Sequence, residues 1–550
     1  RGSNVGAGVG QVYAANTLGA ILGSLLVGFW ILPRLGVQAS CGVLSALLLG
    51  AGLLTLRYTR QKPILLPGAV AVLVGVYLTL PGDLLVQQAY QPLYRDYFGL
   101  TPGSLRYFRE DPYGAVAVGQ QHDGYLRLIV DSVSQMGTEI NGQRYARLMA
   151  HLPLVLQPEA RRALVICFGT GTTVGAASTH SNVLTDCAEL SPGVLGAAPL
   201  FGAVNERVWT RPNVHLVVDD GRHMLRNAGQ YDVITAEPPT PTARGMVNLF
   251  SADYYRLCRD HLTEHGMVCQ GIPLPALGDD QVRLVIRAFQ EVFPDCSIWE
   301  GSPTHLILLG SKAPLALDPA HLAPGFADPS ARRSLAEVGI DSPATLLATF
   351  LHGPTFLRAY CGDIPLVDDD HPYIEYAWND AVPLNPELGH HRPAELWPMI
   401  HGFDQAEIAA RAAALDDLKH LGNPSGGPDH AVQYLLQVRR ITAALPDNPF
   451  VLWWTGLQGF ALQGSPPSLQ AAQAEAFNLL MLHRDREARD ILARLAVQAP
   501  REPMGHLCLG VAELGLGHPA AARQSFDRGL AIFPEGAPRQ SLAALLQEAR

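Results

Sequence analysis

The chain has 550 residues, enough for roughly two to four domains, and a formal net charge of −10 with a sequence pI of about 6.0. This acidic balance argues against a nucleic-acid partner. Hydrophobic residues make up 48% and charged residues only 16%, and the mean hydropathy of +0.11 is high for a soluble enzyme, so we expect a membrane part. The eight cysteines form no CxxC pair, which predicts reduced cytoplasmic thiols and neither a disulfide framework nor a zinc site.

Residues 1–85 are predicted to form transmembrane helices. Three uncharged apolar runs follow one another at residues 14–32, 35–56 and 64–81, the third being short for a span. Such a series is rare in soluble domains and does not fit one cleavable signal peptide, so we expect a multi-pass protein of the cell membrane. The chain begins at Arg1, which suggests a fragment or a residual tag.

The membrane orientation stays open at this stage. Arg57, Arg60 and Lys62 lie between the second and third runs and would be cytoplasmic by the positive-inside rule. If the third run crosses fully, the next domain lies outside, whereas a nucleoside enzyme should lie in the cytoplasm. We expect a cytoplasmic catalytic domain, which requires either an overriding upstream region or a third run that does not cross.

Residues 86–160 are predicted to form a small β region with a lead-in helix. The segments 115–119 and 125–131 alternate in polarity and are β-branched, and a helix is expected at 140–156.

A strand, a glycine turn, a helix and a second strand follow one another from residue 163 to residue 189. The apolar run 163–168 leads into Gly169, Gly171 and Gly175, and Glu189 ends the strand 182–188. Glycines let a ligand approach the backbone, and a carboxylate after the second strand can accept ribose hydroxyls. The GxGxxxG spacing is usual for sites that bind S-adenosylmethionine, whereas dinucleotide folds use GxGxxG. The alternative is a tight turn with Glu189 merely solvated.

The rest of residues 161–330 predicts an α/β domain with a Rossmann-like, methyltransferase-type sheet. Further strands are expected at 214–219, 231–236, 266–272, 295–300 and 304–310, and helices at 172–180, 191–201, 251–264 and 279–292. Only a short turn joins the last two strands, so they should pair antiparallel. Ligand atoms should lie beyond the carboxyl ends of the early strands.

The C-terminal part is predicted to contain an irregular connector, residues 331–430, and a helical region, residues 431–550. The connector should carry helices near 331–338 and 343–352. Its acidic run at 368–370, beside His371, fits a metal site less well than a solvated turn, so no metal is expected. The helical region has a 34-residue repeat, with Ala488, Leu492 and Pro500 matched by Ala522, Phe526 and Pro534, and it resembles tetratricopeptide repeats. It packs on the enzyme or binds a protein partner.

Three sequence blocks within residues 105–312 carry a family resemblance. DSVSQ at 131–135 stands where the family has LDGxxQ, and YARLMAHLP at 145–153 stands where it has YHExLxHxP. YDVITAE at 231–237, followed by NLFS at 248–251, stands where it has YDVIxxD and LFT. With the glycine turn and Asp220-Gly221, this order resembles the polyamine aminopropyltransferases, the spermidine synthase family. The apolar runs ahead of the domain and HPYIEY at 371–376 look like its membrane-attached bacterial branch.

The resemblance implies a role for each matching position. Glu237 would be the base that deprotonates the attacking amine, and Tyr145 a second catalytic residue. Glu189 would accept ribose hydroxyls, Asp220 the adenine amino group, and Gln135 would touch the aminopropyl end. The full nucleoside-binding set comprises Gln135, Gly169, Gly171, Glu189, Asp220 and Gly221. The residues assigned to substrate binding are Asp131, Arg147 and Arg222.

This chain departs from the family at three acceptor-site positions. The family's His and Glu in YHE are Ala146 and Arg147 here, and a downstream Asp is Thr240. A polycation site needs carboxylates, whereas Arg147 and Arg222 suit a ligand that bears a carboxylate. The alternative is that Arg147 points to solvent.

The resulting hypothesis is cleavage of S-adenosylmethionine, or of its decarboxylated form, by amine attack on the three-carbon chain with release of 5′-methylthioadenosine. The amine belongs either to a polyamine, giving aminopropyl transfer, or to the substrate itself, giving an azetidine, and the lost acids slightly favour the second. The alternatives are a methyltransferase on the same fold and a non-catalytic nucleoside-binding membrane sensor. We also expect a homodimer.

Overall fold

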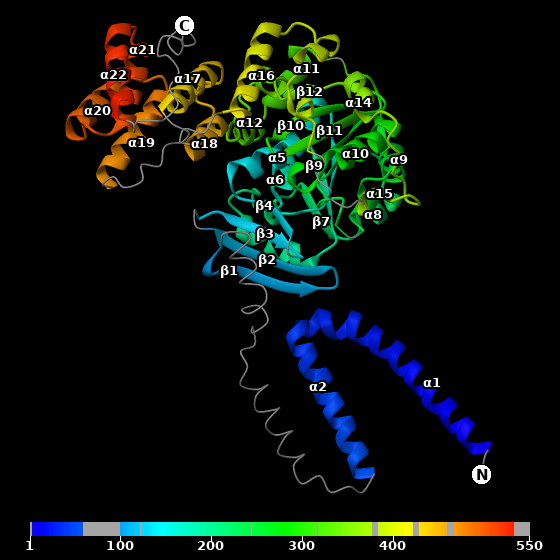
Figure 1. Ribbon diagram of the computed structural model, residues 1–550. Coiled ribbons are helices and arrows are strands. Elements are labelled where there is room, and N and C mark those ends of the chain that lie inside the picture. Colours follow the sequence, from blue (N-terminus) through cyan, green and yellow to red (C-terminus); the bar gives the residue numbers. More distant parts are fainter. Residues whose placement is uncertain are drawn as a thin grey trace.

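The computed structural model describes residues 3–58, 100–121, 124–131, 133–243, 245–315, 317–376, 383–421, 428–458 and 467–532. Along the chain these residues form two N-terminal helices, a four-stranded sheet, an α/β unit built on an eight-stranded sheet, and a group of C-terminal helices (Figure 1).

The N-terminal helices are nearly continuous and bend at Gly36. Helix α1 (Ser3–Leu26) leads through a π-helical turn, η1 (Val27–Ile31), into α2 (Leu32–Tyr58), which breaks at Gly36 with φ 74°. The helices diverge from this bend and stand apart from the α/β unit (Figure 1). At the bend, the Val37 N–H donates to Glu110 Oε2 at 2.8 Å and so connects the helices to the four-stranded sheet.

One described helical segment, Gly6–Gly52, is long and apolar enough to cross a membrane. Length and composition alone give this result, and a core helix or an N-terminal signal sequence meets the same test. The first two predicted runs lie in these helices, whereas the third, at residues 64–81, lies outside the described residues. The predicted multi-pass arrangement therefore stays a prediction.

The four-stranded sheet lies at the end of the α/β unit that faces the N-terminal helices (Figure 1). Its strands pair antiparallel in sequence order and are β1 (Leu100–Asp111), β2 (Gly114–Gln121), β3 (Leu126–Val130) and β4 (Val133–Gly137). The sequence predicted β2 and β3 but not β1 or β4, which are rich in polar residues. Helix α5 (Ile140–Leu156) follows with the predicted bounds.

The large sheet has the order β12-β10-β11-β9-β8-β5-β6-β7. Strands β9, β8, β5, β6 and β7 are parallel neighbours, whereas β11, β10 and β12 add antiparallel. The predicted antiparallel hairpin of the last two strands is thus confirmed. The bounds are β5 (Arg162–Ile166), β6 (Leu184–Glu189), β7 (Val214–Val218), β8 (Tyr231–Ala236), β9 (Leu262–Pro273), β10 (Ser297–Ser302), β11 (His305–Ser311) and β12 (Phe350–His352).

Helices cover both faces of this sheet, because successive strand residues point to opposite sides. Val268 packs in one core with α9 and α10, whereas its neighbour Met267 packs in the other with α5. The helices of the first layer are α8 (Gly221–Asn227), α9 (Ala252–Asp260), α10 (Asp279–Val292) and α14 (Pro354–Cys361). On the other side lie α5, α6 (Thr172–Ser178), α12 (Pro329–Ala336), α13 (Pro343–Leu347) and α16 (Gln405–Lys419).

Two predicted helices end early because a strand begins where each was expected to continue. The helix expected at 251–264 ends at Asp260, because Leu262 already begins β9. The helix expected at 343–352 ends at Leu347, and Phe350–His352 forms the edge strand β12 instead. The remaining short elements are α7 (Pro192–Ala197), η3 (Ala198–Phe201), η4 (Val208–Thr210), η5 (Met246–Leu249), η6 (Leu274–Ala276), α11 (Pro319–Leu322), η7 (Ala323–Phe326), α15 (Tyr373–Tyr376), η8 (Pro386–Gly389), η9 (Pro393–Glu395) and η10 (Trp397–Met399).

The C-terminal helices lie beside α12 and α16 (Figure 1). Ala488 and Leu492 are buried in α20, and their partners in the predicted repeat, Ala522 and Phe526, are buried in α22. The repeated residues therefore occupy matching inward positions, although Pro534 lies outside the described residues. The bounds are α17 (Pro428–Ala444), α18 (Pro449–Gln458), α19 (Pro467–Met481), α20 (Asp485–Gln498), α21 (Pro503–Gly515) and α22 (Pro519–Ile532).

Candidate active site

A cavity of about 450 Å³ lies beyond the carboxyl ends of β5, β6, β7 and β8. The strand order reverses here, because β5 pairs with β6 on one side and with β8 on the other, and such switch points are where open α/β sheets bind ligands. Side chains of β3 and β4 complete the wall. The predicted site residues in the lining are Gln135, Gly169, Glu189, Asp220, Gly221, Arg222 and Glu237.

The glycine turn after β5 requires glycine at two positions. Gly169 and Gly171 have φ of 54° and 80°, in the left-handed region. A Cβ on Gly171 would also lie 2.4 Å from the Phe168 ring. Gly169 lines the cavity, whereas Gly171 shapes the turn without belonging to the lining.

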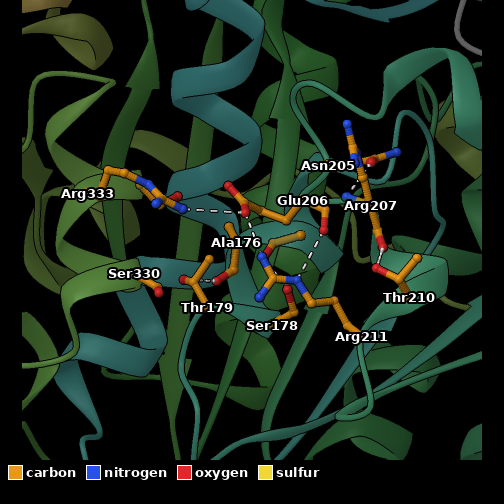
Figure 2. Close-up of polar contacts among 12 residues, drawn as sticks. Ala176, Ser178, Thr179, Asn205, Glu206, Arg207, Thr210, Arg211, Ser330 and Arg333 are labelled. Carbon is orange, nitrogen blue, oxygen red and sulfur yellow. Dashed lines mark hydrogen bonds and ion pairs between the residues drawn. The ribbon is translucent and has the colours of Figure 1, made fainter.

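The third glycine of the motif serves packing and not ligand approach. A Cβ on Gly175 would lie 2.6 Å from the Asn205 carbonyl. Asn205 is fully buried and donates from Nδ2 to the Thr170 carbonyl in the glycine turn at 3.0 Å. After Asn205, Glu206 pairs with Arg211 of the same segment at 2.6 Å and with Arg333 of α12 at 3.6 Å, and so connects this segment to α12 (Figure 2). The glycine turn is thus supported by the hydrogen bond from Asn205 to Thr170.

Glu189 ends β6 and holds the glycine turn. Its Oε2 accepts the Phe168 N–H and its Oε1 accepts the Ser191 N–H, both at 2.8 Å. Burial raises the pKa of Glu189, and these backbone hydrogen bonds oppose the shift. Each carboxylate oxygen has a further lone pair, so ribose hydroxyls can still bind.

Two consecutive acids follow β7. Asp220 Oδ1 accepts the His223 N–H at 2.9 Å and caps α8, and its neighbour Asp219 lies 2.8 Å from His223 Nδ1. Both acids line the cavity, and Gly221 fits there because a Cβ would lie 2.4 Å from Ile166. Sequence reasoning found Asp220 and Gly221 but missed Asp219, although its place directly after a strand was an available signal.

Arg222 lines the cavity, but an acid already occupies its guanidinium. Nη1 and Nη2 bind the two carboxylate oxygens of Asp369 at 2.8 and 2.6 Å, and this pairing raises the pKa of Arg222. Ser251 Oγ also donates to Asp369, at 2.6 Å. Sequence reasoning treated the acidic run 368–370 as a turn, whereas Asp369 closes one side of the cavity. Among the described residues, no group of His, Cys, Asp and Glu is arranged to hold a metal.

Glu237 directly follows β8 and lines the cavity. Its Oε2 accepts from Thr173 Oγ1 at 2.6 Å, whereas its buried Oε1 has no hydrogen-bond partner among the residues described. Burial raises the pKa of Glu237 to about 7, and the Thr173 hydrogen bond opposes the shift. A carboxylate that titrates near neutral pH is suited to act as a general base.

Three predicted residues lie away from the cavity. The Tyr145 ring is buried in the core and stacks on His305, with 4.4 Å between ring centroids. Arg147 points neither to the cavity nor to solvent, because Nη1 donates to the Ser334 carbonyl at 2.8 Å and pairs with Glu337 at 2.6 Å. Asp131 is exposed and accepts the Ala115 N–H at 2.8 Å. None of the three lines the cavity, so the catalytic role of Tyr145 and the substrate-binding roles of Arg147 and Asp131 stay predictions. Tyr145 is nevertheless near the base, because the charge of Glu237 adds to the effect of burial in raising the pKa of Tyr145.

Comparison with known proteins gives one family match. Residues 142–300 match the model of the spermine/spermidine synthase domain. A polyamine aminopropyltransferase of Corynebacterium efficiens is 29% identical over 276 residues, which is 48% of this chain and 51% of that protein. A spermidine synthase of Dictyostelium discoideum is 30% identical over 172 residues, which is 30% of this chain and 59% of that protein.

Two solved structures are also similar over part of this chain. A spermidine synthase in complex with the transition-state analogue AdoDATO is 18% identical, with a TM-score of 0.35, and the match covers 52% of this chain and 87% of that one. The spermidine synthase from Thermotoga maritima is 19% identical, with a TM-score of 0.35 and coverage of 52% and 88%. This chain spans between 51% and 59% of the two sequence relatives named above. Residues 142–300 thus carry a segment that matches the spermine/spermidine synthase domain, inside a chain that is similar to polyamine aminopropyltransferases.

Proposed function

We propose that this chain is an aminopropyltransferase that takes its three-carbon group from decarboxylated S-adenosylmethionine and passes it to an amine. The observation that carries the proposal is Glu237, a carboxylate with a pKa of about 7 and one unpartnered oxygen, in the same cavity as Glu189 and Asp220. A pure binding module has no use for such a group. The sequence relatives named above carry this activity in their names.

The reaction needs one base and little else from the protein. The amine nitrogen attacks the chain carbon next to the sulfonium, and the C–S bond breaks with its electron pair going to sulfur. Methylthioadenosine leaves as a neutral thioether, and the proton of the attacking amine passes to Glu237. Because the sulfonium is already a good leaving group, holding the amine in line supplies most of the remaining acceleration. In this proposal Glu189 holds the ribose and Asp220 the adenine.

The charges of the cavity favour the decarboxylated donor over the intact one. The lining contains five carboxylates, namely Glu189, Asp219, Asp220, Glu237 and Asp369, against the two guanidiniums of Arg222 and Arg226. A ligand with a sulfonium and an ammonium fits this balance better than one that adds a carboxylate. Arg222 is paired with Asp369 and Arg147 is remote, so two reasons for intact S-adenosylmethionine, and with it for cyclisation, are lost.

Product analysis tests the proposal. The purified full chain is incubated with decarboxylated or intact S-adenosylmethionine, each with and without putrescine, and methylthioadenosine is quantified. We expect release only from the decarboxylated donor with an amine present, together with an aminopropyl adduct. Release from the intact donor alone, with an azetidine product, would show cyclisation, and S-adenosylhomocysteine would show methyl transfer. Nucleoside binding without any turnover would favour the alternative of a non-catalytic nucleoside-binding membrane sensor.

We also propose that the N-terminal helices attach the enzyme to the cell membrane, with the catalytic domain in the cytoplasm. The support is the 47-residue segment Gly6–Gly52, whose apolar window has no residue buried by the described part of the chain. The test is extraction of the full chain from membranes. We expect a requirement for detergent, and recovery of monodisperse protein without detergent would contradict the proposal. The homodimer and a protein partner for the C-terminal helices remain predictions.

A further inference from the structure

One hydroxyl connects the base to helix α5. Thr173 lies in the first turn of α6 and is fully buried. Its Oγ1 is 2.6 Å from Glu237 Oε2 and 2.9 Å from the carbonyl oxygen of Ala146, in the middle of α5. Both neighbours are oxygens, and among the described residues neither has another side-chain partner that would compete for this contact. The geometry therefore allows Thr173 to donate to only one of them at a time.

The single proton of this hydroxyl makes the contact sensitive to the charge of Glu237. When Glu237 is ionised, both neighbours are acceptors, so Thr173 donates to the carboxylate and gives up the Ala146 carbonyl. When Glu237 carries its proton on Oε2, the acid donates to Thr173, and Thr173 donates to Ala146. The Ala146 carbonyl loses little in the first state, since it lies inside a helix and keeps its helical position. A threonine hydroxyl can rotate between these two arrangements.

We propose that Thr173 is a positioning residue that holds the ionised base through Oε2 and so directs the substrate proton to Oε1. The proposal rests on the proposed function, in which Glu237 is the base. Oε1 is the oxygen without a partner, which fits the atom that receives the proton from the amine. Thr173 itself touches no reacting atom and does not line the cavity.

A second threonine, Thr235, also hydrogen-bonds helix α5 near Glu237. Pro153 has no N–H, so the Met149 carbonyl lacks its helical donor, and Thr235 Oγ1 of β8 donates to it at 2.9 Å. Thr235 stands two residues before Glu237 on the same strand end. Helix α5 is thus hydrogen-bonded to β8 through Thr235 and to α6 through Thr173, and Glu237 lies between the two contacts.

The test removes the hydroxyl while keeping the shape of the side chain. In Thr173→Val, an ionised Glu237 would lose its only charge-assisted hydrogen bond, so the rising limb of the kcat–pH profile should move upward by about one to two pH units. At pH 7, where half of wild-type Glu237 is ionised, this corresponds to a loss of about 5- to 50-fold in kcat, recovered at higher pH, with KM for the nucleoside unchanged. Thr173→Ser should restore the wild-type profile. Thr179→Val, at the other end of α6, is the matched control and should leave it unchanged.

A second readout does not depend on turnover. The thermal midpoint of the full chain is measured against pH for wild type, Thr173→Val, Glu237→Gln and the double variant. In wild type, the thermal midpoint should decrease as Glu237 ionises with rising pH. In Thr173→Val, this decrease should occur at a pH that is higher by the same one to two units. In Glu237→Gln, with or without Thr173→Val, this decrease should be absent. An unchanged profile in both experiments, or a failure of Thr173→Ser to restore it, overturns the proposal. A wild type without turnover but with the shifted midpoint would refute the proposed function alone.

Discussion

The carboxyl ends of the parallel strands and helix α5 place their polar side chains in different ways. Each strand end delivers its side chain to the same cavity: Glu189 from β6, Asp220 after β7 and Glu237 after β8. Helix α5 runs along the other side of the sheet, and its two predicted site residues turn away. Tyr145 enters the core beside Gly271, and Arg147 reaches α12.

The position of a residue in the sequence predicts its location in the site at the strand ends but not on helix α5. Parallel strands all end at one edge, so a side chain directly after such a strand reaches that edge whatever its identity. A helix residue points according to the neighbours that satisfy it. Arg147 finds the Ser334 carbonyl and Glu337 on α12 and is buried there, with a side chain only 5% exposed. Substitutions at Glu237, Glu189 and Arg147 therefore have distinct expected effects.

Glu237→Gln should reduce kcat by ~10²–10⁴-fold, the usual contribution of a general base, because the amide cannot take the proton. Nucleoside affinity should stay within about twofold of wild type, since Glu189 and Asp220 are untouched. Steady-state release of methylthioadenosine and calorimetric titration with the nucleoside provide the two numbers. Normal turnover in this variant would remove Glu237 from the mechanism whichever amine attacks.

The same variant should be more stable than wild type above neutral pH. Burial raises the pKa of Glu237 from 4.5 to about 7, so the folded state binds this proton more tightly than the unfolded state. Its stabilising effect is complete below the unfolded pKa and is lost as the pH rises through 7, which costs wild type about 3 kcal/mol at pH 8. Thermal midpoints of both proteins between pH 5 and 8 should diverge with rising pH. A constant difference would show that the carboxyl titrates normally.

Glu189→Ala should weaken nucleoside binding by about 2–3 kcal/mol, or roughly 30- to 150-fold. It removes the proposed acceptor of the ribose hydroxyls and frees the Phe168 N–H in the glycine turn. Asp131→Asn is the control, because Asp131 was also assigned to substrate but lies outside the cavity and keeps its Ala115 contact through the amide oxygen. An equal loss of nucleoside affinity in both variants would contradict the proposal that Glu189, at the end of β6, binds the nucleoside whereas Asp131 does not.

Arg147→Met should affect stability and not the substrate. The loss of the hydrogen bond to the Ser334 carbonyl and of the pair with Glu337 should lower the free energy of unfolding by about 1–3 kcal/mol. KM for the nucleoside and for the amine should not change. The measurement combines denaturant unfolding with steady-state kinetics, and a large rise in either KM at unchanged stability would return Arg147 to the active site.

The sequence was sufficient for the α/β sheet, because its strands are short apolar runs separated by turn residues, and its glycine turn has a characteristic spacing. The edge strand β12 was hidden, since Phe350–His352 follows a helical pattern and gains strand pairing only from β10. Asp369 was also hidden, because its role depends on Arg222 about 150 residues earlier in the chain. The orientation of Arg147 depends in the same way on α12, which no local pattern shows.

The role of Glu237 as the base is tested by the pH dependence of kcat in the wild-type protein. The measured reaction is the release of methylthioadenosine from decarboxylated S-adenosylmethionine at saturating amine. The base works when ionised, so kcat should rise with pH through about 7, with a slope that fits one group, and then level off. The rise should be absent from the residual activity of Glu237→Gln. A profile that shows no group near 7, or the same rise in both proteins, would contradict the assignment of Glu237 as the base.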